Sequence, residues 1–70
     1  TSNGRMDIVV QTDKYIYIME LKMDATADEA LKQIEDKGYA KPFAADPRKL
    51  FRIGVGFSSE TRRIKEWRVI

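Results

Sequence analysis

Residues 7–23 read DIVVQTDKYIYIMELKM, and this stretch decides the fold. β-Branched and aromatic residues dominate two runs, 7–11 and 15–23, which are typical of strands. The link between them, residues 12–14, is short and polar. A link of this length joins antiparallel neighbours, because a parallel return needs a dozen or more residues. The stretch therefore predicts an antiparallel β-hairpin.

The hairpin brings charged residues together at one end. Counting back from the turn places Asp7, at the start of the first strand, beside Glu20 in the second. Strand alternation puts Glu20 and Lys22 on the same face as Ile16 and Ile18. Charges that continue an apolar stripe must be paired, metal-bound or at a rim, because an unpaired buried charge is too costly.

A divalent cation would compensate the repulsion between two neighbouring carboxylates. Mg²⁺ prefers oxygen ligands and typically takes one or two carboxylates from a protein. Asp7 and Glu20 can supply these, and the backbone carbonyl of Leu21 can add a neutral oxygen; Mn²⁺ is the alternative ion. Lys22 would then face a metal-bound water or a phosphate oxygen. The pattern indicates a candidate phosphodiester-cleaving site, whereas the structural alternative is a set of ordinary strand-end charges.

A helix is expected directly after the hairpin. Thr26 and Glu29 have the spacing of a capping box, in which each side chain satisfies a backbone amide of the first turn. Gly38 suits the position just past the helix end. The apolar stripe at helical spacing consists of Ala27, Ala30, Leu31 and Ile34. This helix should pack on the sheet.

Two further strands are expected after the helix. In the first, apolar residues at 51, 53, 55 and 57 alternate with Arg52, Gly54 and Gly56. The glycines let another element approach closely, most often a packed helix and less often a nucleic-acid backbone. The last strand should place Lys65, Trp67 and Val69 on one face and Ile64, Glu66, Arg68 and Ile70 on the other. The fold class is thus α/β (α+β): one domain, residues 1–70, with a small mixed sheet of about four strands and one main helix.

Several strings together carry a family resemblance. Asp7 is followed by Glu20-x-Lys22 on the next strand and by a helix with Gln33 and Tyr39. This arrangement resembles the PD-(D/E)XK nuclease superfamily, and in particular its bacterial branch in which such a domain follows an AAA-ATPase-like domain. The matching strings are residues 4–7, 19–22, 33–40 and 53–58, so the resemblance covers nearly the whole chain. Met6 stands where the motif has its proline.

The resemblance implies a restriction endonuclease-like core in which the Asp, the Glu and a main-chain carbonyl bind Mg²⁺ and the Lys assists hydrolysis. It also implies that Gln33 and Tyr39 support the metal site or contact substrate. The alternatives are a solvated Gln33 and a Tyr39 that closes the end of the core; for Tyr39 packing is favoured.

The superfamily core usually begins with a helix that this chain lacks, so the chain resembles a fragment. We expect the full-length protein to be a Mg²⁺-dependent nuclease and the isolated fragment to be inactive. An uncovered sheet edge or face would favour a homodimer.

Charge is unevenly divided along the chain. Residues 1–40 hold 5 basic and 8 acidic side chains, and residues 41–70 hold 8 basic and 3 acidic ones. The basic half favours a polyanionic partner, with DNA preferred over RNA. Candidate contacts to a nucleic-acid backbone are Arg48, Lys49, Arg52, Arg62, Arg63, Lys65 and Arg68. Each of them singly is also explained as a solubilising surface residue.

Composition and hydropathy narrow the possible kinds of structural site and the expected cellular location. The 70 residues include neither cysteine nor histidine, which excludes disulfides and makes a structural zinc site improbable. No stretch is apolar enough to span a membrane and none resembles a signal peptide, so a cytoplasmic location is expected. The alternative to a nuclease is a non-catalytic module, appended to an ATPase, that binds nucleic acid or regulates.

Overall fold

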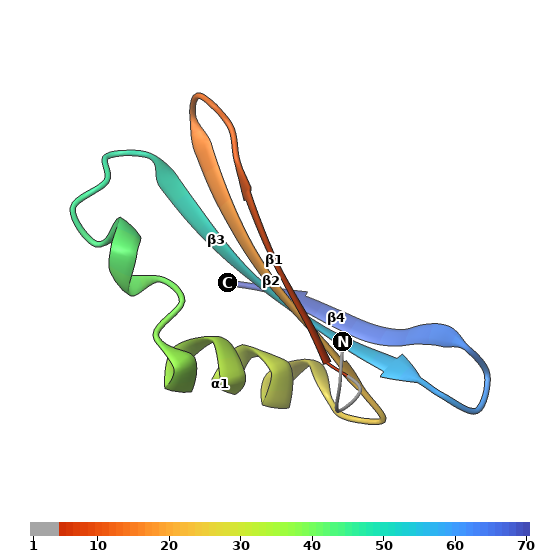
Figure 1. The fold of residues 1–70 in the computed structure, drawn as a ribbon. Helices are drawn as coiled ribbons and strands as arrows, with labels where there is room; N and C mark the ends of the chain where they lie inside the picture. Colours follow the sequence, from red (N-terminus) through yellow and green to blue (C-terminus); the bar gives the residue numbers. More distant parts are fainter. Residues whose placement is uncertain (1–4) are drawn as a thin grey trace.

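The computed structural model describes residues 5–70, whose strands form one four-stranded mixed sheet with order β1-β2-β3-β4 (Figure 1). The outer pairs, β1 with β2 and β3 with β4, are antiparallel, and the central pair is parallel. The elements are β1 (Arg5–Gln11), β2 (Tyr15–Met23), α1 (Ala27–Lys37), the 3-10 helix η2 (Lys41–Phe43), β3 (Lys49–Ser58) and β4 (Arg63–Val69). The predicted fold class and hairpin are confirmed. Within these residues no helix is long and apolar enough to cross a membrane.

Helix α1 begins and ends where the sequence predicts. Glu29 N donates to the Thr26 hydroxyl at 3.0 Å, and Thr26 N donates to the Glu29 carboxylate at 2.9 Å. Hydrogen bonds from Thr26 to the Glu29 carboxylate, first from its backbone amide and then from its side chain, are the main reason that the pKa of Glu29 is lowered. Gly38 ends the helix with a φ of 68°, in the left-handed region that glycine adopts without strain. An unforeseen cap comes from β4, where Glu66 accepts a hydrogen bond of 2.8 Å from Ala27 N.

Helix α1 and the loop before it pack against β3 at the two glycines of that strand. A Cβ atom at Gly54 would clash with the carbonyl oxygen of Ala27 in the helix, and one at Gly56 with that of Ala25 in the loop. The expectation that a packed helix approaches these glycines is therefore confirmed for Gly54, whereas at Gly56 the close neighbour is the loop. The buried core between α1 and the sheet consists of Ile16, Ile18, Leu31 and Ile34.

The alternation predicted for the last strand is wrong at its start. Gly56 pairs with Glu66, but the next residue, Phe57, pairs with Ile64, so that Lys65 is an extra residue in β4. Such a bulge shifts the side-chain alternation by one position. Ile64 therefore lies on the face of Phe57 and Trp67, and not on the face of Glu66.

Arg48 ties the tip of the β1–β2 hairpin to the segment that precedes β3. Its guanidinium donates to both carboxylate oxygens of Asp46, at 2.9 and 2.7 Å. It also donates to the carbonyl oxygen of Thr12 at 3.0 Å and to Oε1 of Gln11 at 2.9 Å. The hydrogen bonds from Arg48 lower the pKa of Asp46 from 3.8 to about 2. The pair thus holds together two segments that are distant in sequence.

This pair predicts a loss of stability in acid. The lowered pKa of Asp46 means that its contribution is complete above pH 3.8 and is lost as the pH falls towards about 2. Between these values the parent chain should lose stability more steeply than Arg48→Ala, measured as the urea midpoint against pH. The control Arg63→Ala removes an exposed arginine of β4 and should follow the parent curve. Parallel curves for the parent and Arg48→Ala would contradict the prediction.

Candidate functional site

Asp7 and Glu20 lie directly opposite each other in the β1–β2 pairing. Directly paired residues share one face of a sheet, so the expectation that the two carboxylates lie side by side is confirmed. The same cross-strand row continues through Gly54 of β3 to Arg68 of β4. Because α1 packs against Gly54, this row lies on the face of the sheet that the helix covers.

The two carboxylates differ sharply in their exposure. Glu20 is 0% exposed, while Asp7, on the edge strand β1, is exposed. A carboxylate enclosed in this way is stable only with a proton, a hydrogen bond or a cation beside it. The pair therefore has one sealed side, at Glu20, and one side open to solvent, at Asp7.

Tyr39 connects the end of α1 to the carboxylate pair. Its hydroxyl donates a hydrogen bond of 2.7 Å to Oδ2 of Asp7. Its ring packs against the hydrophobic core cluster. Gly38 turns the chain at the helix end and so presents Tyr39 towards β1. Tyr39 thus packs on the core with its ring and contacts Asp7 with its hydroxyl, while its support of a metal site stays a prediction.

Lys22 and Gln33 flank the pair. Lys22 is two residues from Glu20 on the same face of β2 and is half-buried. After the hydrogen bonds with Thr26, the charge of Lys22 is a further cause of the lowered pKa of Glu29, which places its ammonium group near the start of α1. Gln33 is half-buried on α1. The catalytic and supporting roles of these residues stay predictions.

The donor atoms available at this place fit Mg²⁺ or Mn²⁺. Asp7 and Glu20 offer oxygen ligands only, and two carboxylates with several waters satisfy Mg²⁺. Residues 5–70 contain no group of three His, Cys, Asp or Glu side chains that could hold a metal ion. A third protein ligand would therefore have to be a main-chain oxygen, such as the carbonyl of Leu21.

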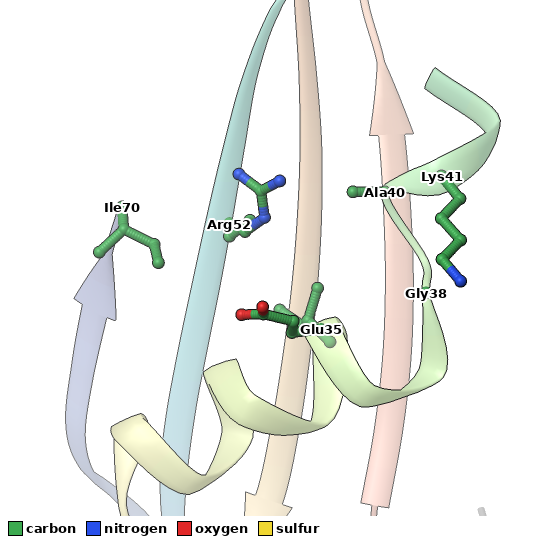
Figure 2. Close-up of a pocket in the computed structure, with 7 residues that line it drawn as sticks. Glu35, Gly38, Ala40, Lys41, Arg52 and Ile70 are labelled. Atoms are coloured by element: carbon green, nitrogen blue, oxygen red, sulfur yellow. The ribbon is translucent and has the colours of Figure 1, made fainter. Parts of the chain in front are cut away.

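An open cleft of about 410 Å³ lies beside Tyr39 (Figure 2). Arg52 on β3, Glu35 on α1 and Lys41 on η2 line it, and Figure 2 shows Arg52 and Lys41 on opposite sides of the view, with the Lys41 side chain running beside Gly38. Gly38 and Ala40, the two neighbours of Tyr39, form part of its wall. Lys41 was not foreseen from the sequence, because its place in the cleft depends on the turn after α1.

The other basic candidates do not gather on one surface. Arg48 is engaged at the hairpin tip, and Lys49 lies over the ring of Phe51 at 5.4 Å. Arg68 forms an ion pair of 2.8 Å with Asp28. Three exposed residues, Arg62, Arg63 and Lys65, lie in or next to the turn between β3 and β4. Arg52 and Lys41 are the basic residues that line the cleft next to Tyr39.

The fold and the carboxylate pair define an α+β domain of nuclease-like architecture. A family model described as PD-(D/E)XK nuclease superfamily matches residues 1–67, and the chain belongs to this superfamily.

Among curated proteins, the chain is 36% identical over 66 residues to a protein of Azotobacter chroococcum mcd 1, described as an uncharacterized protein in the vnfD 5′ region. The match covers 91% of this chain and 13% of that relative, so the chain spans a small part of the relative's length. No solved structure matches the chain.

The Tyr39 hydrogen bond predicts a measurable effect on stability. Tyr39→Phe removes the hydroxyl but keeps the ring in the core, so it should lower the free energy of unfolding by about 1 kcal/mol. The measurement is the urea midpoint at pH 7. Tyr15→Phe is the matched control, because Tyr15 lies on the other face of the sheet and contacts Tyr17 and Phe51 through its ring. Equal midpoints for the two variants would contradict the prediction.

Proposed function

We propose that this domain is a divalent-metal-dependent nuclease domain that hydrolyses phosphodiester bonds of nucleic acid, with DNA preferred over RNA. The observation that carries the proposal is the direct pairing of Asp7 with Glu20 on one face of the sheet. Membership of the PD-(D/E)XK superfamily supports it, because nucleases of this superfamily generally depend on divalent metal ions.

Each residue has a distinct task in this proposal. Asp7 and Glu20 hold Mg²⁺ or Mn²⁺ together with the carbonyl oxygen of Leu21. The ion, when bound, supplies Lewis-acid activation of water and neutralises phosphate charge. Lys22 orients the attacking water or offsets the charge that grows on the phosphate. Tyr39 holds the Asp7 carboxylate in place through its hydrogen bond.

The difference in exposure between the two carboxylates sets the direction of approach. Glu20 is enclosed under the helix and Asp7 is open, so substrate reaches the pair from the β1 edge. Arg52 and Lys41 line the cleft next to Tyr39 and offer positive charge to the polyanion, with Arg52 on β3, two strands from the β1 edge. Gln33 supports the site from α1. The basic residues of the β3–β4 turn serve as weaker, outlying contacts.

The activity of the whole protein is a separate part of the proposal. The chain spans 13% of its Azotobacter relative, which is consistent with a domain that works inside a longer chain. We propose that the longer chain carries an upstream ATPase-like domain and that the isolated 70 residues are inactive.

A second candidate is a non-catalytic module of the same fold that binds nucleic acid or regulates the ATPase. The full burial of Glu20 favours this candidate, because an enclosed carboxylate is less accessible to a metal ion from solvent. Such a module would show no metal-dependent turnover.

Metal binding at the carboxylate pair predicts a stabilised fold. A cation at about ten times its Kd contributes about 1.4 kcal/mol of stability, which raises the Tm of a domain of this size by roughly 5–10 °C. Asp7→Asn should abolish the shift with Mg²⁺ or Mn²⁺. Asp13→Asn, at the exposed hairpin tip, should retain it. A Tm that changes with neither ion would contradict metal binding at this site.

Cleavage by the longer chain tests catalysis directly. Asp7→Asn and Lys22→Met should each lower the rate of metal-dependent DNA cleavage by about 100-fold or more, because the first removes a metal ligand and the second removes the ammonium that offsets the developing charge. The matched controls Asp13→Asn and Lys14→Met change the same residue types at the hairpin tip and should cleave at the parent rate. Binding of DNA with no metal-dependent cleavage would favour the non-catalytic module.

A further inference from the structure

The cleft next to Tyr39 contains an arginine that has no acidic partner among the described residues. Arg52 is half-buried on β3, and within residues 5–70 its guanidinium forms no hydrogen bond or ion pair. Its backbone forms hydrogen bonds of 2.9 and 2.8 Å with Ile70, which fix where the side chain leaves the sheet. A guanidinium that has lost part of its hydration is stabilised by an anion that accepts its hydrogen bonds. Arg52 is therefore a candidate to bind an anion supplied by another molecule.

Two other arginines show what this chain provides when a guanidinium has an internal role. Arg48, which is also half-buried, binds the carboxylate of Asp46 at 2.7 Å. Arg68 binds the carboxylate of Asp28 at 2.8 Å. Internal pairing thus explains these two arginines but does not explain Arg52.

The surroundings of Arg52 suit a phosphate that is attached to an organic group. Lys41 lies across the cleft from Arg52 (Figure 2) and also has no ion-pair partner within residues 5–70. Two cations suit a phosphate monoester, with about two negative charges, better than a carboxylate with one. Ile34, Ala40 and Ile70 give the cleft apolar walls, and its volume of about 410 Å³ is in the range of small-molecule sites.

We propose that Arg52, together with Lys41, binds the phosphate group of a nucleotide, either free or within a nucleic-acid strand. The planar guanidinium offers parallel N–H donors that match two phosphate oxygens, and the lysine adds a flexible point charge. The apolar walls of the cleft then pack against the sugar or the base.

The openings around Arg52 admit either source of the phosphate. A second opening of about 430 Å³ shares Arg52, Glu35 and Ile70 with the first and extends along α1 to Asp28. Arg52 therefore borders both openings. A free nucleotide needs one of them, whereas a strand runs through both.

The proposed phosphate site is separate from the carboxylate pair. Gly38 and Ala40 line the cleft, whereas Tyr39 between them donates its hydroxyl to Asp7. Binding of a free nucleotide therefore requires neither the carboxylates nor a metal ion. Only the strand-bound form rests on the proposed function, and the two proposals fail separately because phosphate binding is measured without a divalent ion.

Calorimetric titration of the chain with inorganic phosphate and with deoxyadenosine monophosphate, without divalent ions, tests the site. Arg52→Met should weaken the binding of both probes by about tenfold or more, because hydrogen bonds between charged groups are lost. Lys41→Met should weaken it less, and because Lys41 is exposed this variant tests the site even where Arg52→Met fails to fold. Lys14→Met removes one positive charge at the exposed hairpin tip and should bind as the parent does. Parent affinity in Arg52→Met and Lys41→Met would overturn the proposal.

Glu35 provides a test of opposite sign. It lines the same cleft but forms no ion pair with Arg52. Glu35→Gln removes a negative charge near the phosphate and should tighten binding roughly two- to threefold. Lower urea midpoints for both Glu35→Gln and Arg52→Met, with no change in phosphate affinity, would show that these two side chains pair with each other and would overturn the proposal.

A single-stranded oligodeoxynucleotide distinguishes the two sources of the phosphate. For a strand, Arg52→Met should lower the slope of log K against log salt concentration by about 0.7. Binding of the mononucleotide but not of the strand would assign the site to a free nucleotide. Acetate that binds as tightly as phosphate would overturn the choice of ligand, and a folded chain that binds neither phosphate probe saturably would overturn the site.

Discussion

The close contact between α1 and β3 is the constraint on which the rest of the structure depends. The helix backbone reaches the sheet at Gly54, and the loop before the helix reaches it at Gly56, because neither residue has a side chain in the way. This contact encloses Glu20, which neighbours Gly54 in the sheet. It also positions the helix on the sheet, and Gly38 at the helix end then directs the Tyr39 hydroxyl to Asp7. Helix α1 packs closely on one face of the sheet and encloses the Glu20 carboxylate there. Within residues 5–70 it is the one α-helix, so the opposite face is left uncovered by these residues.

Local chemistry made much of this fold predictable from the sequence. The short polar link of the hairpin determined strand direction and register, and the capping box with Gly38 determined both ends of α1. Glycines alternating with apolar residues indicated a close approach to β3. These signals lie within a few residues of one another, where spacing translates directly into geometry.

The features that the sequence did not reveal depend on contacts between distant segments. The extra residue at Lys65 depends on how β4 meets β3, and it moved Ile64 to the other face. Arg48 was a candidate phosphate contact, but Asp46 and the hairpin tip occupy its guanidinium. Arg68 is similarly engaged by Asp28. An isolated positive charge in a sequence cannot show whether an acidic partner folds next to it, so the basic residues were the least predictable part of the site.

The hairpin register controls both faces of the sheet at once. A slip of β1 by one residue would turn Asp7 towards the face away from α1 and Val10 towards the helix, because alternate residues point to opposite sides. A slip of two residues would keep each side chain on its face but would move Asp7 about 7 Å along the strand from Glu20. The observed register is therefore the one that places the two carboxylates together and keeps Asp7 off the opposite face. Both properties depend on the same three-residue link and on the Arg48 contacts at its tip, so a change that shifts the link disturbs both faces together.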